Sequence, residues 1–114
     1  MPIIPLVSPV TSDERMKKIS SFFENPPLVY CVSTTGTTGV RKTLPDGLPE
    51  YLGKVKNHFK APRAVGFGIS KPEHTKELSG VAEIAIIGSA VIDLIDKNPS
   101  FEKPLAKFIK SLMP

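Results

Sequence analysis

The sequence predicts an α/β fold with a parallel sheet, made of four strand–helix units in one domain that covers residues 1–114. The spacing of two kinds of segment favours this fold. Short runs rich in β-branched residues alternate with amphipathic stretches at intervals of roughly 25–30 residues. We find no linker and no internal repeat beyond this rhythm. A complete (β/α)8 barrel needs about 250 residues, and the 114 residues here are fewer than half of that.

The four predicted strands are short apolar runs bounded by turn-forming residues. Pro5 interrupts the first run, which suits an edge strand or the start of a strand because proline cannot donate to a central ladder. The runs are residues 3–7, 28–32, 64–67 and 81–87.

Two helix starts carry a capping-box pattern, in which a hydroxyl and a carboxylate satisfy backbone N–H groups at the first turn. Thr11 with Glu14 opens the first helix, and the prolines at 26 and 27 end it. Ser70 with Glu73 opens a second helix, which runs to about Leu78. The other predicted helices have apolar residues at helical spacing and cover residues 48–59, 89–95 and 101–112.

Charge and composition exclude several classes of protein. Lys and Arg exceed Asp and Glu by 15 to 11, and the resulting charge of +4 is scattered rather than gathered in the stripe that nucleic-acid binding needs. The longest apolar run, residues 84–87, is far too short to cross a bilayer, and no signal peptide is visible. A single cysteine favours a reducing compartment. We therefore expect a cytoplasmic protein without nucleic-acid or membrane partners.

Three predicted strands end in glycine-bearing loops. Ligands of parallel α/β folds bind at the carboxyl ends of the strands, where glycine lets backbone N–H groups approach an anion. Gly88 and Ser89 also open a helix, whose free N–H groups favour a phosphate. The alternative is that the glycines only serve tight strand–helix turns. The loops are residues 36–39, 66–70 and 88–90.

Other kinds of site find little support. The Gly66-x-Gly68 pair lacks the third glycine of a dinucleotide fingerprint, because Lys71 stands there. His58 and His74 have no partners at metal-ligand spacing and are predicted to face solvent. Cys31 is expected to be a buried, inert thiol. We expect neither a metal nor a cofactor.

The carboxylates form no convincing acid–base pair. Asp13 and Glu14 belong to a helix start, Glu73 to a predicted cap, and Asp93 and Asp96 to a helix that leaves the sheet. The residues thus predict a chain that holds a phosphate without carrying out chemistry on it.

Four segments in order resemble the tryptophan synthase α chain family, from the fifth strand to the last helix of its (β/α)8 barrel. The resemblance covers nearly the whole chain and implies a (βα)4 half-barrel, the carboxyl-terminal half of that fold. The segments are residues 5–15 (PLVSPVTSDER), 30–39 (YCVSTTGTTG), 64–74 (AVGFGISKPEH) and 87–90 (IGSA).

The resemblance implies a substrate and a set of site residues. The family cleaves indole-3-glycerol phosphate to indole and glyceraldehyde 3-phosphate, and passes indole to a β chain. Four positions match its phosphate-binding residues: Gly39, Gly68, Gly88 and Ser89. Thr38 matches the loop threonine that helps to close the site, and Tyr30 and Phe67 match residues that line the pocket. From the residues alone, a packed aromatic side chain explains Tyr30 as well as a pocket-lining hydroxyl does.

The departures from the family concern catalysis. Its two catalytic carboxylates lie in the first half of the barrel, which this chain lacks, so we predict no catalytic residue and no activity for the chain alone. Open strand edges predict association with the missing amino-terminal half or with a second copy. The alternative is a free-standing or engineered half-barrel that binds phosphate ligands or self-associates without catalysis.

Overall fold

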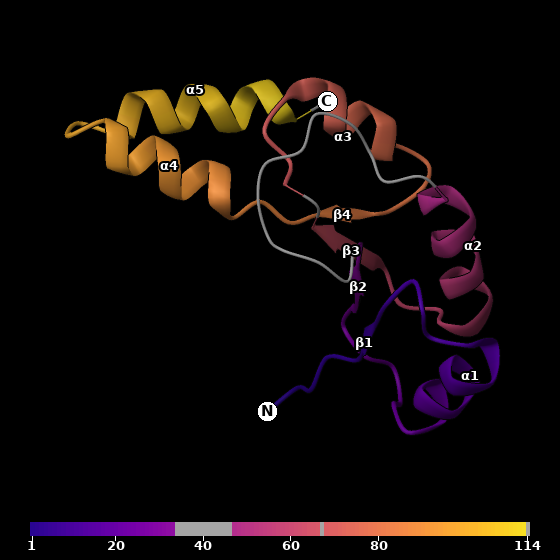
Figure 1. The fold of residues 1–114 in the computed structure, drawn as a ribbon. Helices are drawn as coiled ribbons and strands as arrows, with labels where there is room; N and C mark the ends of the chain where they lie inside the picture. The colour runs from indigo at the N-terminus through magenta and orange to yellow at the C-terminus, as the bar shows by residue number, and fades with distance from the viewer. Residues whose placement is uncertain (34–46, 67, 114) are drawn as a thin grey trace.

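The computed structural model describes residues 1–33, 47–66 and 68–113, and its elements follow the predicted order (Figure 1). Strands and helices alternate up to the last strand, which two helices follow. The elements are β1 (Leu6–Val7), α1 (Asp13–Ser21), β2 (Val29–Val32), α2 (Leu48–His58), β3 (Arg63–Gly66), α3 (Pro72–Leu78), β4 (Ile84–Ala85), α4 (Ser89–Lys97) and α5 (Glu102–Leu112).

The strands form one parallel sheet in the order β1-β2-β3-β4, as predicted. The two outer strands are shorter than expected. Before β4, the backbone N–H groups of Val81 and Ala82 both bond to the carbonyl of Leu78, so these residues wrap the end of α3 and the strand begins only at Ile84. The result is a sheet with long central strands and short edge strands.

The core lies between one face of the sheet and the helices α1 and α2. Val7, Cys31 and Val65 stand in one row across the three strands, because Val7 pairs with Cys31 and Cys31 with Val65. All three are at most 1% exposed. Met16 of α1 and Leu52 of α2 are fully buried in the same cluster. Period-two alternation therefore assigns this face of the sheet to the core.

The row on the opposite face pairs Leu6 with Tyr30, and Ala64 with Ile84. Side chains alternate along a strand, so this row points away from α1 and α2. Leu6 is 58% exposed, and Tyr30 and Ile84 are half-buried. This second face is thus incompletely covered by the described residues.

Helices α4 and α5 form an antiparallel pair that extends away from the sheet, and the end of α5 returns beside α3 (Figure 1). No residue of α4 is buried, and Leu112 is the buried residue of α5. None of the helices in the described ranges has the length and apolarity needed to cross a bilayer.

The first predicted capping box is shifted by one residue. The N-cap of α1 is Ser12, whose side chain accepts a hydrogen bond from the Arg15 backbone N–H at 3.1 Å. Thr11 instead accepts from the Ser8 backbone N–H at 3.0 Å, which closes the turn between β1 and the helix. Ser12 caps the helix because the hydroxyl of Thr11 is already bonded within the turn.

Candidate functional site

The carboxyl ends of β2, β3 and β4 lie against one another. Ser33, which follows β2, donates its hydroxyl to the Gly66 carbonyl at the end of β3 over 2.7 Å. A Cβ placed on Gly66 would lie 3.4 Å from the Tyr30 hydroxyl and 3.5 Å from the side chain of Ile86. Three strands therefore contribute to one small area at this edge of the sheet.

The loop after β3 needs a glycine. Gly68 has φ of +80°, a backbone conformation that residues with a side chain rarely adopt. The next residue, Ile69, is 1% exposed and belongs to the core. The buried isoleucine anchors the loop while Gly68 itself stays half-exposed at the strand end.

The second predicted capping box does not form. The N-cap of α3 is Lys71, which makes no side-chain capping bond. Instead, Nδ1 of His74 accepts a hydrogen bond from the Ser70 backbone N–H at 3.1 Å. His74 is 1% exposed, so the prediction that it faces solvent is wrong. Its helical position looked solvent-facing by local pattern, and only the packing of α3 against the rest of the fold buries it.

Gly88 and Ser89 stand where the chain passes from β4 into α4. Gly88 is the N-cap of α4, with no side-chain capping bond and no acidic residue in the first turn. A Cβ on Gly88 would have no neighbour within 4 Å, so the space around it is open. Ser89 is half-buried. The first N–H groups of the helix and its positive dipole end are thus uncompensated by a local carboxylate, an arrangement that suits an anion.

Several predicted site residues fall outside the described ranges: Thr38, Gly39 and Phe67. The other predicted residues fall inside them: Tyr30 lies within β2, Gly68 follows β3, and Gly88 and Ser89 follow β4. The hydroxyl of Tyr30 lies beside the space above Gly66, which places it at the same edge of the sheet.

The ionised groups with clear partners lie elsewhere. Glu83 precedes β4 and accepts from the Arg63 side chain at 2.6 and 3.1 Å, and this bonding holds the pKa of Glu83 below its usual value. Asp13 pairs with His58 at 3.1 Å and with Lys54 at 3.6 Å, and the His58 bond lowers its pKa. The described residues contain no group of three His, Cys, Asp or Glu side chains able to hold a metal.

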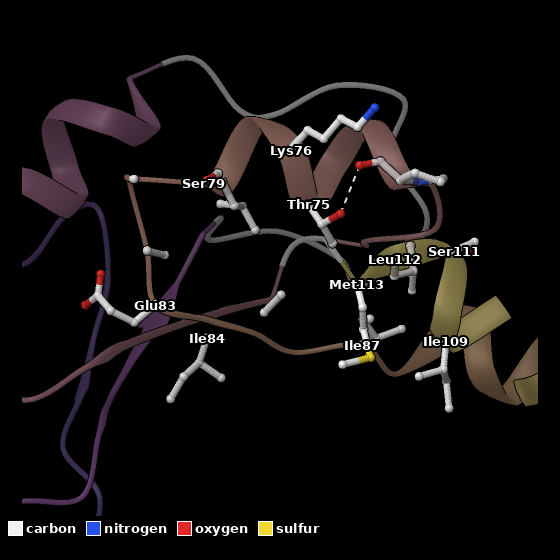
Figure 2. Close-up of a pocket in the computed structure, with 15 residues that line it drawn as sticks. Thr75, Lys76, Ser79, Glu83, Ile84, Ile87, Ile109, Ser111, Leu112 and Met113 are labelled. Carbon is white, nitrogen blue, oxygen red and sulfur yellow. Dashed lines mark hydrogen bonds between the residues drawn. The ribbon is translucent and has the colours of Figure 1, made fainter. Parts of the chain in front are cut away.

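A groove of about 780 Å³ runs along the free edge of β4, between α3 and the end of α5 (Figure 2). Most of its lining is apolar, and Ile84, Ile87, Ile109 and Met113 are among the side chains drawn there. It carries no cluster of convergent polar groups like that expected for a phosphate. The groove is a feature of the open strand edge.

Comparison with known proteins gives a consistent result. Residues 1–112 match the family described as "Tryptophan synthase alpha chain". The chain is 43% identical over 105 residues to the tryptophan synthase alpha chain of Geobacillus kaustophilus, covering 91% of this chain and 38% of that protein. It is 44% identical over 96 residues to that of Methanocaldococcus jannaschii, covering 84% of this chain and 34% of the relative.

Solved structures agree with the sequence matches. The tryptophan synthase A-subunit of Pyrococcus furiosus is similar with a TM-score of 0.79 and 32% identity, over 98% of this chain and 44% of that one. Mycobacterium tuberculosis tryptophan synthase gives 0.78 at 28% identity, over 96% of this chain and 39% of that one. The chain therefore spans less than half the length of the relatives that it matches, and its fold is part of their barrel.

Proposed function

The chain belongs to the tryptophan synthase alpha chain family, and we propose that it is the carboxyl-terminal half-barrel, the half that binds the phosphate of indole-3-glycerol phosphate. Its domain is the single unit of residues 1–114. The order of the four family-like segments supports this placement, because they follow the course from the fifth strand to the last helix.

One observation supports the proposed phosphate site. The half-exposed Gly68 and the uncapped start of α4 at Gly88 both stand at the carboxyl edge of neighbouring parallel strands. Backbone N–H groups at such positions bind phosphate through charge-assisted hydrogen bonds, and the Ser89 hydroxyl adds a donor. Gly39 from the loop after β2 completes the proposed set, with Thr38 closing the site and with Tyr30 and Phe67 lining the pocket.

The same half does not carry out the reaction by itself. Cleavage of the bond between indole and the glycerol phosphate needs a proton donor and a base, which this family draws from the first half of its barrel. Asp13 and Glu83, the described carboxylates whose pKa is lowered, are held in ion pairs with His58, Lys54 and Arg63. We therefore assign no catalytic residue to the chain. The partner that supplies the carboxylates is the amino-terminal half of an α chain, and the β chain binds the completed barrel.

Calorimetry with glycerol 3-phosphate tests the phosphate site. We expect a single site in the wild-type chain, with affinity reduced at least tenfold in Gly88→Asp because the added carboxylate repels the phosphate. Ser89→Ala should weaken binding about ten- to a hundredfold through the loss of one hydrogen bond to a charged group. The control is Ser111→Ala, which alters an exposed serine of α5. Equal binding by Gly88→Asp and the wild type would overturn the assignment.

An indole-release assay separates this proposal from the alternative, a free-standing module that binds phosphate ligands without catalysis. The Tyr30 hydroxyl and Ile86 both lie close to Gly66 within this chain, which favours a ligand site that needs no further domain. The chain alone should release no indole from indole-3-glycerol phosphate. Addition of the first half of a family α chain should restore release for a split enzyme and leave a binding module inactive. Substantial turnover by the chain alone would contradict both.

A further inference from the structure

His74 is buried and its ring is oriented by the backbone of the preceding loop. The residue is 1% exposed, and Nδ1 accepts the hydrogen bond from the Ser70 backbone N–H over 3.1 Å. A ring nitrogen that accepts carries no proton, so Nδ1 is the acceptor that faces the loop.

The bond acts on the loop rather than on the helix. Ser70 lies one residue before Lys71, the N-cap of α3, so its N–H is outside the set that opens the helix. The first turn of α3 is closed separately, by the bond from the His74 backbone N–H to the Lys71 carbonyl at 3.0 Å. This hydrogen bond of the imidazole therefore restrains the chain before the helix.

Two consecutive residues of the loop are thereby held in place. Ile69 is anchored in the core, and the next residue, Ser70, is held by the buried imidazole. Gly68 directly precedes this pair, with φ of +80° and partial exposure at the strand end. Any rotation of the peptide at Ser70 is transmitted through Ile69 to Gly68, because Ile69 is the single residue between them.

We infer that His74 is a positioning residue for the phosphate site: it holds the loop that presents Gly68 and does not itself touch the ligand. This inference rests on the proposed function, since Gly68 belongs to the proposed phosphate set. Preorganised N–H groups bind an anion without the entropic cost of ordering a loop, which is how a buried acceptor behind the site raises affinity.

A matched pair of variants isolates the acceptor. Oδ1 of asparagine is attached to Cγ, as is Nδ1 of histidine, so His74→Asn keeps an acceptor at nearly the same place. Leucine has the same branched shape as asparagine without polar atoms, so His74→Leu removes the acceptor. Both variants lose the remainder of the imidazole ring equally, and their difference reports the hydrogen bond to Ser70.

Two measurements on the 114-residue chain test the inference: glycerol 3-phosphate affinity by calorimetry, and exchange of the Ser70 amide by NMR. We expect His74→Leu to bind glycerol 3-phosphate about three- to tenfold more weakly than the wild type, the range of one hydrogen bond. Its Ser70 amide should exchange at least about tenfold faster in the folded state. His74→Asn should recover most of both losses.

The possible results are distinct. Wild-type affinity in His74→Leu would overturn the positioning role, and so would equal loss in both variants, because the rest of the ring rather than its Nδ1 acceptor would then be responsible. A wild-type chain that binds no glycerol 3-phosphate would overturn the proposed phosphate site, and the positioning role with it, whatever the Ser70 amide shows. Melting temperatures of the variants identify any that fail to fold, and the Ser70 exchange rate in folded His74→Asn then decides whether the acceptor holds the loop.

Discussion

Arg63 shows how one buried charge is accommodated at the end of the sheet opposite the proposed site. Its side chain is 5% exposed and reaches both carboxylate oxygens of Glu83 and, through one guanidinium nitrogen, the Leu52 carbonyl at 3.0 Å. The Glu83 carboxylate also accepts the Arg63 backbone N–H at 3.0 Å. The pair thus joins the start of β3 to the residue before β4 and to α2.

Glu83→Gln should lower the free energy of unfolding by about 1–2 kcal/mol at neutral pH, because the buried guanidinium loses its counter-charge. The figure is reduced for solvent screening, since the Glu83 side chain is 46% exposed. The native-state pKa of Glu83 lies below 4.5, so its stabilisation is complete above that pH and is lost as the pH falls through the native pKa. Urea unfolding should therefore show the variant and the wild type converging in acid.

Glu77→Gln, on the exposed face of α3, is the control for this experiment and should change the free energy of unfolding little at any pH. A difference between Glu83→Gln and the wild type that stays constant across the acid range would contradict the role of the charge.

Cys31 is the one cysteine of the chain and is fully buried in β2, as the sequence predicted. Burial raises the pKa of its thiol to about 12, so the reactive thiolate is scarce at ordinary pH. We expect no reaction with a thiol reagent under mildly alkaline native conditions, and one equivalent of reaction after unfolding in urea. Rapid labelling of the folded chain would show that β2 opens or that the core is not formed.

At the level of elements, apolar runs, hydrophobic periodicity and helix-start patterns predicted every helix and strand in the described ranges. The details set by tertiary contacts were not predictable. Val81 and Ala82 look like strand residues, yet the Leu78 carbonyl takes both of their N–H groups. Thr11 has the spacing of an N-cap, yet Ser12 has that role. Sequence spacing predicts which residue caps a helix or joins a strand only when no nearby turn uses the same hydrogen-bonding groups.

The pair of helices α4 and α5 is the least supported part of the described structure. No residue of α4 is buried, and α5 meets the core through Leu112, which is 5% exposed. By contrast, Leu52 and Val55 of α2 are fully buried. Sparse burial predicts local opening at low free energy. Amides of α4 and α5 should therefore exchange faster than those of α2, and slow exchange throughout would contradict this expectation.

Leu112→Ala should release α5 while leaving the sheet folded, because truncation removes the buried side chain of this helix, which lies beside α3. Amide exchange in α5 should accelerate by at least about tenfold, with little change in α2. Ile109→Ala is the control, since Ile109 is 44% exposed on the same helix. Equal effects of the two truncations would show that Leu112 is not the anchor.

For the molecule as a whole, the sequence predicted the parallel sheet and the edge at which the proposed site lies. Both predictions depend on the alternation of strands and helices and on glycine-bearing loops, which short segments of sequence are enough to show. It did not predict the burial of His74, which depends on how α3 packs against residues distant in sequence. The radius of gyration, 15.3 Å, exceeds the roughly 13 Å of a compact domain of this length. The molecule is extended because α4 and α5 pack on little of the remainder.

The exposed apolar surface predicts association of the chain in solution. At one edge of the sheet, Leu6 of β1 is 58% exposed and Ile3, which precedes the strand, is 70% exposed; the apolar groove lies along β4 at the other edge. The sheet order separates these two edges by β2 and β3, so the surface of β1 does not cover the groove of the same molecule. Apolar surface and free backbone groups at both edges favour pairing with another chain.

Sedimentation over a range of concentrations should give masses above the 12.4 kDa of one chain, rising with concentration. Leu6→Lys should shift this equilibrium towards the monomer, because it places a charge on the uncovered row of β1 while removing no buried contact. Phe22→Lys is the matched control: it also replaces an exposed apolar residue, 82% exposed at the end of α1, but away from both strand edges. A stable, compact 12.4 kDa species at every concentration would refute association, and equal dissociation by both substitutions would show that the contact is not made through β1.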